Sequence, residues 1–193
     1  MRILAIDPGP TQSGVVVYGE GGVIYAKQRD NEIFVAELRA EKWGPEIWGE
    51  MVEIDLLAIE WIENYGYAVG RDVFQTVYWI GRFAEAWWAT SSCLLIPRRD
   101  VKIALCGKST YRDPVTGSMK GIQDKHIRRA IINRFPARGG GKTPAVGTKA
   151  KPGPLYGMKS HLWSALAVAL TAEQMALCEP TANPRVEGAD FDD

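Results

Sequence analysis

Two short apolar runs in this chain each end in an acidic residue. Residues 3–6 are followed by Asp7, and residues 56–59 are followed by Glu60. Short apolar runs bounded by turn signals are typical of buried strands. If the two strands are neighbours, their carboxylates converge at one edge of a sheet, and a divalent cation is the simplest relief for their repulsion. Asp7 taken alone is slightly better explained as a hydrogen-bond partner of the turn that follows it.

Hydrophobic spacing predicts an α/β domain around these runs. Turns at 8–10 and 19–22 separate apolar segments at 3–6, 13–18 and 23–26, which predicts three antiparallel strands. Helical spacing is predicted over 31–40, with Asn31 as its cap, and over 72–90, 124–135 and 160–177, and a strand over 94–96. We expect a mixed five-stranded sheet, three antiparallel N-terminal strands plus two parallel strands, flanked by helices.

The length of 193 residues favours one domain. We expect a folded domain over 1–178, a flexible basic loop over 136–158, where four prolines and a glycine triplet abolish any period, and a disordered acidic tail over 179–193. No apolar run reaches the roughly 20 residues that cross a bilayer, and the N-terminus lacks a signal-peptide pattern, so we expect a cytoplasmic protein without a membrane partner. Three cysteines without a CxxC pair predict buried free thiols.

Charge is segregated along the chain although the formal net charge is zero. Residues 1–96 carry 7 basic and 14 acidic groups, whereas residues 125–172 carry 9 basic groups and no acidic one. Such a stretch is the footprint of a surface that binds a polyanion, with nucleic acid as the first candidate. A solvated basic face balanced by the acidic tail explains the same pattern about as well.

The last predicted helix offers a third ligand for the acidic pair. His161 and Ser164 are three residues apart and therefore share a helix face. A lone histidine on a helix is more often a capping or packing residue than a ligand, so His161 gains weight only together with Asp7 and Glu60. The aromatic residues of 72–90 favour a core or a dimer interface over a platform for base stacking.

Several segments, taken in order, resemble the RuvC-type Holliday-junction resolvases of the ribonuclease H-like nuclease superfamily. They are ILAIDPG at 3–9 with Ser13-Gly14, LAIE at 57–60, Pro97 with Val101-Lys102 and Gly107, Lys125 at the start of a helix, and HLWSALA at 161–167. The resemblance spans about residues 1–178. A compact resolvase of this kind suits a bacterium or its phage, so a phage-type member in a bacterial or phage-infected cell is compatible with it.

The resemblance implies roles for individual residues. Asp7 and Glu60 match the family's first two metal-binding acids, and His161 falls where the last helix carries an aspartate or a histidine. Ser164 falls where the family usually has an aspartate, which is the main departure. A serine hydroxyl is a poor ligand for a hard cation, so one metal binds more weakly, or a water, Glu63 or Asp124 substitutes. Lys125 matches a catalytic basic residue near the scissile phosphate.

The implied activity is metal-dependent hydrolysis of DNA phosphodiesters in four-way junctions, as in DNA recombination and repair. The implied cofactor is a pair of Mg²⁺ ions per site, with Mn²⁺ as a substitute, bound by Asp7, Glu60, His161 and Ser164. Because a junction is cut symmetrically, a homodimer is expected, with 72–90 as its interface. The expected DNA-binding residues are Lys125, Arg128, Arg129, Arg138, Lys142, Lys149, Lys151, Lys159, Tyr65 and Tyr67. Glu63 occupies the place of the family's junction-opening aromatic, so Tyr65 or Tyr67 would serve in its stead.

Three other functions remain open at this stage. A related nuclease acting on other branched or single-stranded DNA would use the same residues. A non-catalytic junction-binding protein is favoured by Ser164. An actin-like ATPase shares the first strand and its turn, but it needs two comparable lobes, for which 193 residues are too few.

Overall fold

A computed structural model describes residues 1–40, 53–63, 66, 68–87 and 92–178. The strands are β1 (Arg2–Asp7), β2 (Gln12–Gly19), β3 (Gly22–Asp30), β4 (Leu56–Trp61), β5 (Ser92–Pro97), β6 (Thr110–Arg112) and β7 (Met119–Gly121). The helices are α1 (Asn31–Arg39), α2 (Arg71–Trp87), α3 (Arg98–Cys106), α4 (Asp124–Arg134) and α5 (His161–Cys178). Tyr65, Tyr67 and the tail 179–193 lie outside the described residues.

The central sheet has five strands in the order β3-β2-β1-β4-β5. β1 pairs antiparallel with β2 and β2 with β3, while β4 pairs parallel with both β1 and β5. The predicted mixed sheet of three antiparallel and two parallel strands is therefore confirmed. Because β1 and β4 are adjacent and parallel, the two acid-terminated runs end at the same edge of the sheet.

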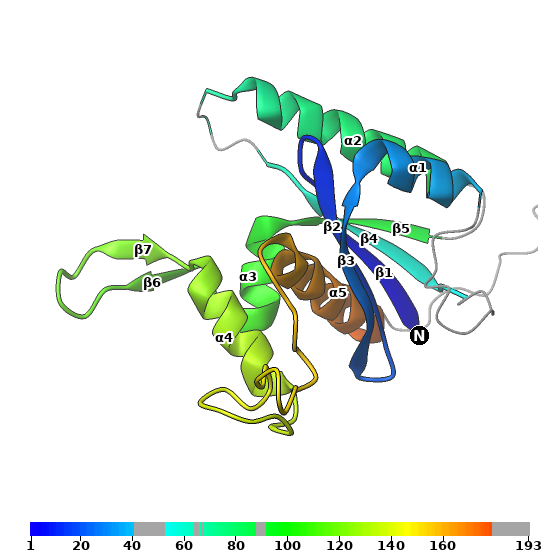
Figure 1. Cartoon of the computed structure of the whole chain (residues 1–193). Helices are drawn as coiled ribbons and strands as arrows, with labels where there is room; N and C mark the ends of the chain where they lie inside the picture. Colours follow the sequence, from blue (N-terminus) through cyan, green and yellow to red (C-terminus); the bar gives the residue numbers. More distant parts are fainter. Residues whose placement is uncertain (41–52, 64–65, 67, 88–91, 179–193) are drawn as a thin grey trace, which may run out of the picture.

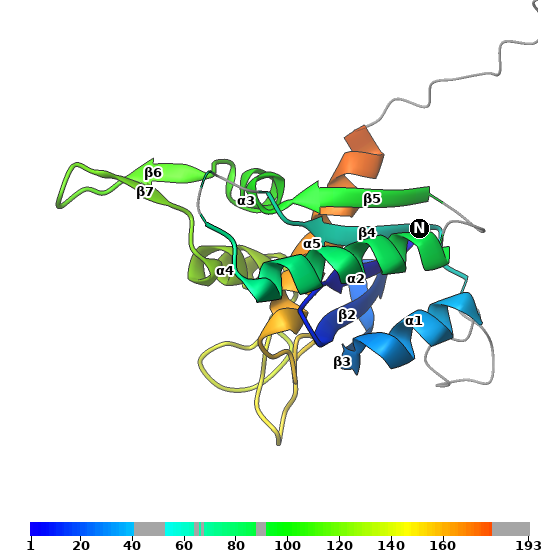
Figure 2. The same ribbon diagram turned by 90° about the horizontal axis from the view of Figure 1, so that it is seen from above.

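Helices cover both faces of this sheet (Figures 1 and 2). α1 and α2 pack on one face, against side chains such as Leu4, Ile6 and Ile59. α3, α4 and α5 pack on the other, against Ile3, Ala5 and Ala58. The alternation of strand side chains explains the division, since successive residues of a strand point to opposite faces.

Two of the expected helices, α1 and α2, differ in detail from their prediction. α1 is capped by Asp30, whose side chain accepts hydrogen bonds from the backbone N–H groups of Glu32 and Ile33, so the expected cap at Asn31 is wrong by one residue. The aromatic residues of α2 divide between its two sides. Trp79 and Phe83 are buried against the sheet, whereas Phe74 and Tyr78 are exposed.

Three short elements between β5 and α4 were not expected from the sequence. α3 begins directly after Pro97 and ends at Gly107, whose φ of 73° is in the left-handed region that favours glycine. β6 and β7 then form a hairpin that projects away from the body (Figures 1 and 2). Asp113 organises its turn by accepting hydrogen bonds from the backbone of Val115 and Thr116 and by pairing with Lys120.

The segment 136–158 lacks helices and strands, but it is a packed loop. The backbone N–H of Gly140 donates to the Lys151 carbonyl at 2.9 Å, and that of Leu155 donates to the Ala145 carbonyl at 2.9 Å. Ala145 and Leu155 are themselves buried in the core under α4 and α5. Hydrogen bonds within a loop leave no periodic trace in a sequence, so these contacts were not expected. The flexibility predicted from the prolines and glycines stays a prediction.

The three cysteines are free, as expected. The expectation that all are buried is wrong for Cys178, which is exposed at the end of α5, while Cys93 and Cys106 are partly buried. Among the described residues, no helix combines the length and the hydropathy that a membrane span requires.

Candidate functional site

Asp7 and Glu60 lie side by side at the ends of β1 and β4. Ile6 pairs with Ile59 in the parallel ladder, so the two acids are the next residues on each strand. Both have the strand parity of Ala5 and Ala58 and therefore face the α5 side of the sheet. Burial is the main reason why the pKa of Asp7 is raised, and it raises the pKa of Glu60 to about 8, helped by the neighbouring Asp7 carboxylate.

A buried polar network fixes the turn that follows Asp7. The Asn31 amide donates to the Gly9 carbonyl at 2.9 Å, and the Ser13 hydroxyl donates to the Asn31 side-chain oxygen at 2.7 Å. A Cβ atom on Gly9 would meet the backbone oxygen of Gln12 at 2.4 Å, so the tight turn requires glycine there. Asn31 thus positions the Asp7 turn, a role that the sequence did not reveal.

His161 stands at the first position of α5 and joins the acidic pair. Its Nδ1 lies 2.8 Å from Oδ2 of Asp7. The imidazole is 47% exposed, whereas the Asp7 carboxylate is 13% exposed, so the histidine lies between the buried acid and solvent. The structure therefore brings together Asp7, Glu60 and His161, three of the predicted site residues from distant parts of the chain.

Arg98 is a site residue that the sequence analysis missed. It is the first residue of α3, and its Nη1 lies 3.2 Å from Oε2 of Glu60. Its Nη2 pairs with Oδ1 of Asp124 at the start of α4. The signal that could have found it is its position one residue beyond β5, at the same sheet edge as Asp7 and Glu60.

Ser164 and His161 line one cavity, as their helical spacing predicted. The cavity has a volume of about 490 Å³ and is lined by Asp124, Lys125, Arg128, Ser160, His161, Trp163 and Ser164. Lys125, the expected basic residue near a scissile phosphate, thus lines the same cavity as His161. A larger cavity of about 510 Å³, lined by Met1, Leu56 and Met175 among others, is at the amino-terminal end of β4, away from the acidic pair.

The donor set fits a divalent cation in part. Asp7 and Glu60 supply adjacent carboxylates in a poorly solvated place, which a cation would stabilise. Within the part of the chain that the structure describes, however, no group of three or more His, Cys, Asp or Glu side chains has an arrangement that could hold a metal ion. In this structure Asp7 bonds to His161, and Glu60 bonds to Arg98. The acid pair therefore fits a cation, and the predicted set of four ligands is not preformed.

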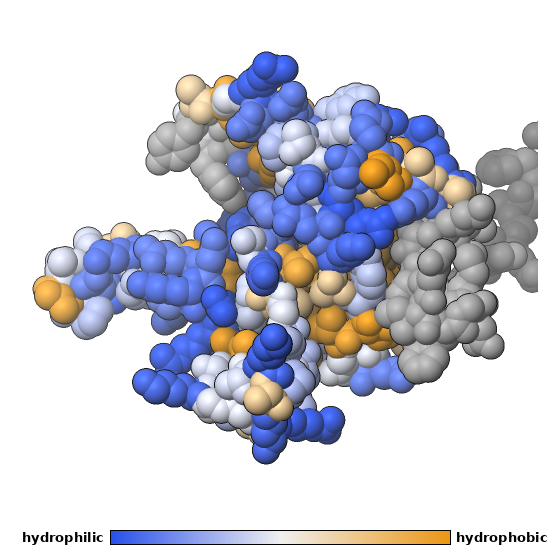
Figure 3. All heavy atoms as spheres, viewed as in Figure 1, coloured by the Kyte–Doolittle hydropathy of each residue, from blue (hydrophilic) through white to orange (hydrophobic). Residues whose placement is uncertain are grey.

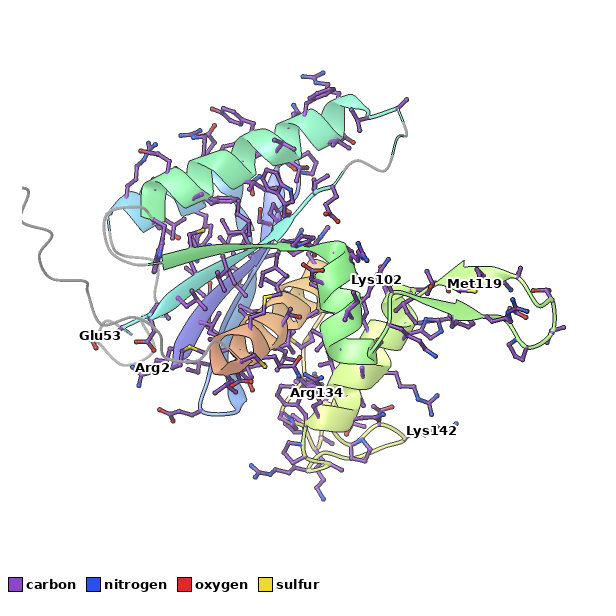
Figure 4. The ribbon with its side chains drawn as sticks, turned by 180° about the vertical axis from the view of Figure 1, so that it is seen from behind. Arg2, Glu53, Lys102, Met119, Arg134 and Lys142 are labelled. Atoms are coloured by element: carbon purple, nitrogen blue, oxygen red, sulfur yellow. The ribbon has the colours of Figure 1, made fainter. Side chains whose placement is uncertain are left out.

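Several basic side chains lie toward the end of the molecule that bears the hairpin (Figure 4). In Figure 4, Lys102 on α3 and Lys142 on the loop lie toward the end that bears the hairpin, opposite Arg2 and Glu53. Hydrophilic residues are also frequent on the hairpin and on the loop 136–158, which stand out from the body in Figure 3. The expected DNA-binding residues that fall in the described part are all exposed: Lys125, Arg128, Arg129, Arg138, Lys142, Lys149, Lys151 and Lys159.

Arg128 connects the site to the basic loop. Its guanidinium lies over the Trp163 ring, 4.5 Å from the ring centroid. It lines both the cavity beside His161 and a second cavity of about 390 Å³, whose walls include Gly140, Lys142 and Thr148. The role of Trp163 in holding Arg128 was not apparent from the sequence.

Comparison with solved structures identifies the architecture. A structure of Thermus thermophilus RuvC superimposes with a TM-score of 0.58 and 19% sequence identity, covering 92% of this chain and 96% of that one. The chain has the RuvC fold. A structure of T. thermophilus RuvC in complex with Holliday junction substrate gives a TM-score of 0.57 and 17% identity over 92% of this chain and 95% of that one. A scan of protein-family models and a search of curated proteins found no match. The resemblance to RuvC is thus confirmed for the fold.

Proposed function

We propose that this chain is a structure-selective endonuclease that cuts four-way DNA junctions in a reaction that depends on a divalent metal. One observation carries the proposal: Asp7, Glu60 and His161 meet at the edge of a RuvC fold, beside a cavity bordered by Lys125 and Arg128. The RuvC neighbour in complex with Holliday junction substrate supports a branched DNA as the ligand.

Asp7 and Glu60 would hold the metal, Mg²⁺ or Mn²⁺. When bound, it would lower the pKa of a coordinated water and stabilise the leaving oxygen of the phosphodiester. Because Nδ1 of His161 faces the Asp7 carboxylate, a proton on Nδ1 leaves Nε2 as the acceptor. His161 is therefore suited to take the proton of an attacking water, and Asp7 fixes its ring and tautomer.

DNA would follow the basic end of the molecule. Lys125 borders the His161 cavity and is suited to a phosphate beside the cut. Arg128 and Lys142 border the next cavity along the surface, and they would contact further phosphates of the same strand. Such contacts give affinity without base reading, so binding falls steeply as the salt concentration rises.

The active species would be a homodimer, because two cuts in one junction need two sites. The outer face of α2 supports this assignment. Phe74 is 65% exposed, Tyr78 58% and Val77 39%, which is an apolar surface on a helix whose other side is buried in the core. This face is opposite the one that carries α5, so pairing through α2 leaves the acidic site open.

A second candidate is a protein that binds junctions without cutting them. It is favoured by Ser164 in place of a ligand and by the lack, among the described residues, of a preformed three-member metal cluster. A nuclease that prefers flaps or single strands is the remaining alternative. The binding protein would yield no cleavage product, and the other nuclease would prefer a different substrate. One assay therefore separates all three candidates.

The assay incubates the purified chain with a labelled four-way junction, a duplex and a flap, in Mg²⁺, in Mn²⁺ and in chelator. We expect metal-dependent cleavage of the junction that is lost in Asp7→Asn and retained in Asp55→Asn, which removes the same charge before the opposite end of β4. Binding without cleavage in either metal would favour the second candidate. Equal cutting of duplex and junction would exclude a resolvase, and cleavage by Asp7→Asn would exclude the assigned site.

A further inference from the structure

Arg98 is placed among three carboxylates at the edge of the sheet. It bonds to Glu60 and Asp124, and its charge also interacts with Asp7. The side chain is only 23% exposed, although it is the first residue of a helix that begins at the surface. A guanidinium in such a place is held by its charged partners, because its burial would otherwise be costly.

The position of Arg98 follows from the register of the parallel strands. Glu60 pairs with Ile96 and Trp61 with Pro97, so the residue after β5 lies at the level just beyond Glu60. α3 starts there, with Pro97 in extended conformation at its cap. The rigid sheet therefore directs Arg98 toward the acidic pair in the same way that it aligns Asp7 with Glu60.

The net charge of the side chains around Arg98 limits how many divalent ions this site can bind. Asp7, Glu60 and Asp124 contribute three negative charges when ionised, and Arg98 contributes one positive charge, which leaves two negative charges. One divalent ion neutralises them, whereas two divalent ions would leave an excess of two positive charges beside Asp7 and Glu60, whose side chains are each 13% exposed. Beyond Asp124, helices α4 and α5 add no carboxylate up to Ala172, since residues 125–172 contain none.

We propose that Arg98 supplies the charge that a second metal ion would otherwise supply, so that each chain binds one divalent ion at the Asp7–Glu60 pair. The inference rests on the proposed function. It reduces the number of ions per site from the two that the family resemblance implied to one. Arg98 acts through Glu60 and Asp124, and it is a positioning residue. It also gives Ser164 an explanation, because a site for one ion does not need another ligand on α5.

The test counts bound Mn²⁺ by electron paramagnetic resonance of the free ion during titration of the full-length chain. We expect one Mn²⁺ per wild-type chain and two per chain in Arg98→Ala, with the first ion bound about tenfold more tightly. Arg98→Lys keeps the charge and should bind one ion. Arg99→Ala, an adjacent exposed arginine of the same helix, is the matched control and should also bind one. If Arg98→Ala fails to fold, Arg98→Gln removes the charge while keeping a polar side chain of similar reach.

Each result is decisive. Two ions in the wild-type chain, or one ion in both Arg98→Ala and Arg98→Gln, would overturn the inference while leaving the nuclease proposal intact. No bound ion in the wild-type chain would overturn both the inference and the metal dependence. One ion in the wild-type chain and two in the uncharged variants, without junction cleavage by the wild type, would retain the inference and reject the nuclease.

Discussion

A Cβ atom on Gly14 would lie 2.5 Å from the carbonyl oxygen of His161. The backbone of β2 thus touches the first turn of α5 at the residue that contacts Asp7. Gly14 is also the antiparallel partner of Asp7. The same glycine therefore sets the spacing between the strand that carries the acid and the helix that carries the histidine.

Replacing Gly14 by alanine should disturb both stability and the site. The new methyl group would force α5 away from the sheet, and we expect a loss of about 2 kcal/mol in the free energy of unfolding, measured by urea denaturation. In Gly81→Ala the added Cβ meets nothing within 4 Å. That control, inside α2, should be neutral or stabilising by up to about 1 kcal/mol. Equal effects of the two substitutions would contradict the close approach.

The pH dependence of stability should report the buried Glu60. Burial raises the pKa of Glu60 from 4.5 to about 8. Between these values the folded chain holds a proton that the unfolded chain has released, so the free energy of unfolding falls as pH rises through this window. Glu60→Gln removes this proton uptake. In chelator, wild type should lose at least about 1 kcal/mol more than Glu60→Gln between about pH 5 and about pH 8. Parallel stability curves would show that Glu60 has an ordinary pKa.

Arg128 should contribute to the binding of DNA by its place over Trp163. In Arg128→Ala we expect junction affinity to fall about threefold to tenfold, and the slope of log affinity against log salt to decrease by about one. The matched control is Arg82→Ala, since Arg82 lies over Trp79, 4.9 Å from the ring centroid, on α2. Fluorescence anisotropy across a salt series measures both quantities. A similar loss in the two variants would mean that the basic end of the molecule is not the DNA surface.

The outer face of α2 should hold the dimer together. Phe74→Asp places a charge in the proposed interface, so it should shift the mass measured by sedimentation from dimer to monomer without unfolding the chain, because Phe74 is 65% exposed. Val115→Asp, at a hairpin residue that is 91% exposed, should leave the mass unchanged. A wild-type chain that sediments as a monomer at micromolar concentration would reject the dimer.

The acid pair could be predicted from the sequence because its causes are local. Each apolar run marks a strand and each acid marks the end of its run. The parallel pairing of β1 with β4 was a condition of that prediction, and the structure meets it. Predicting Arg98 as a site residue would have required the register between β4 and β5, which the sequence does not display. His161 was found only in combination with the other two residues.

For the loop 136–158, the sequence predicted the secondary structure but not the packing. Prolines and glycines predict an absence of helix and strand, and they predict it correctly for 136–158. Whether such a segment packs depends on contacts such as that of Leu155 with Ala145, which obey no period. The hairpin of β6 and β7 was missed because three-residue strands are too short to display alternation.

The parallel register between β1 and β4 makes the acidic pair depend on the exact number of residues in β4. Since successive side chains of a strand alternate between the faces of the sheet, deletion of a single residue within β4 would turn the Glu60 carboxylate toward α2 and away from Arg98. An odd change in the length of β4 would therefore abolish the acidic pair at once, whereas the hairpin of β6 and β7 projects from the body (Figure 1) and can change in length without shifting either strand.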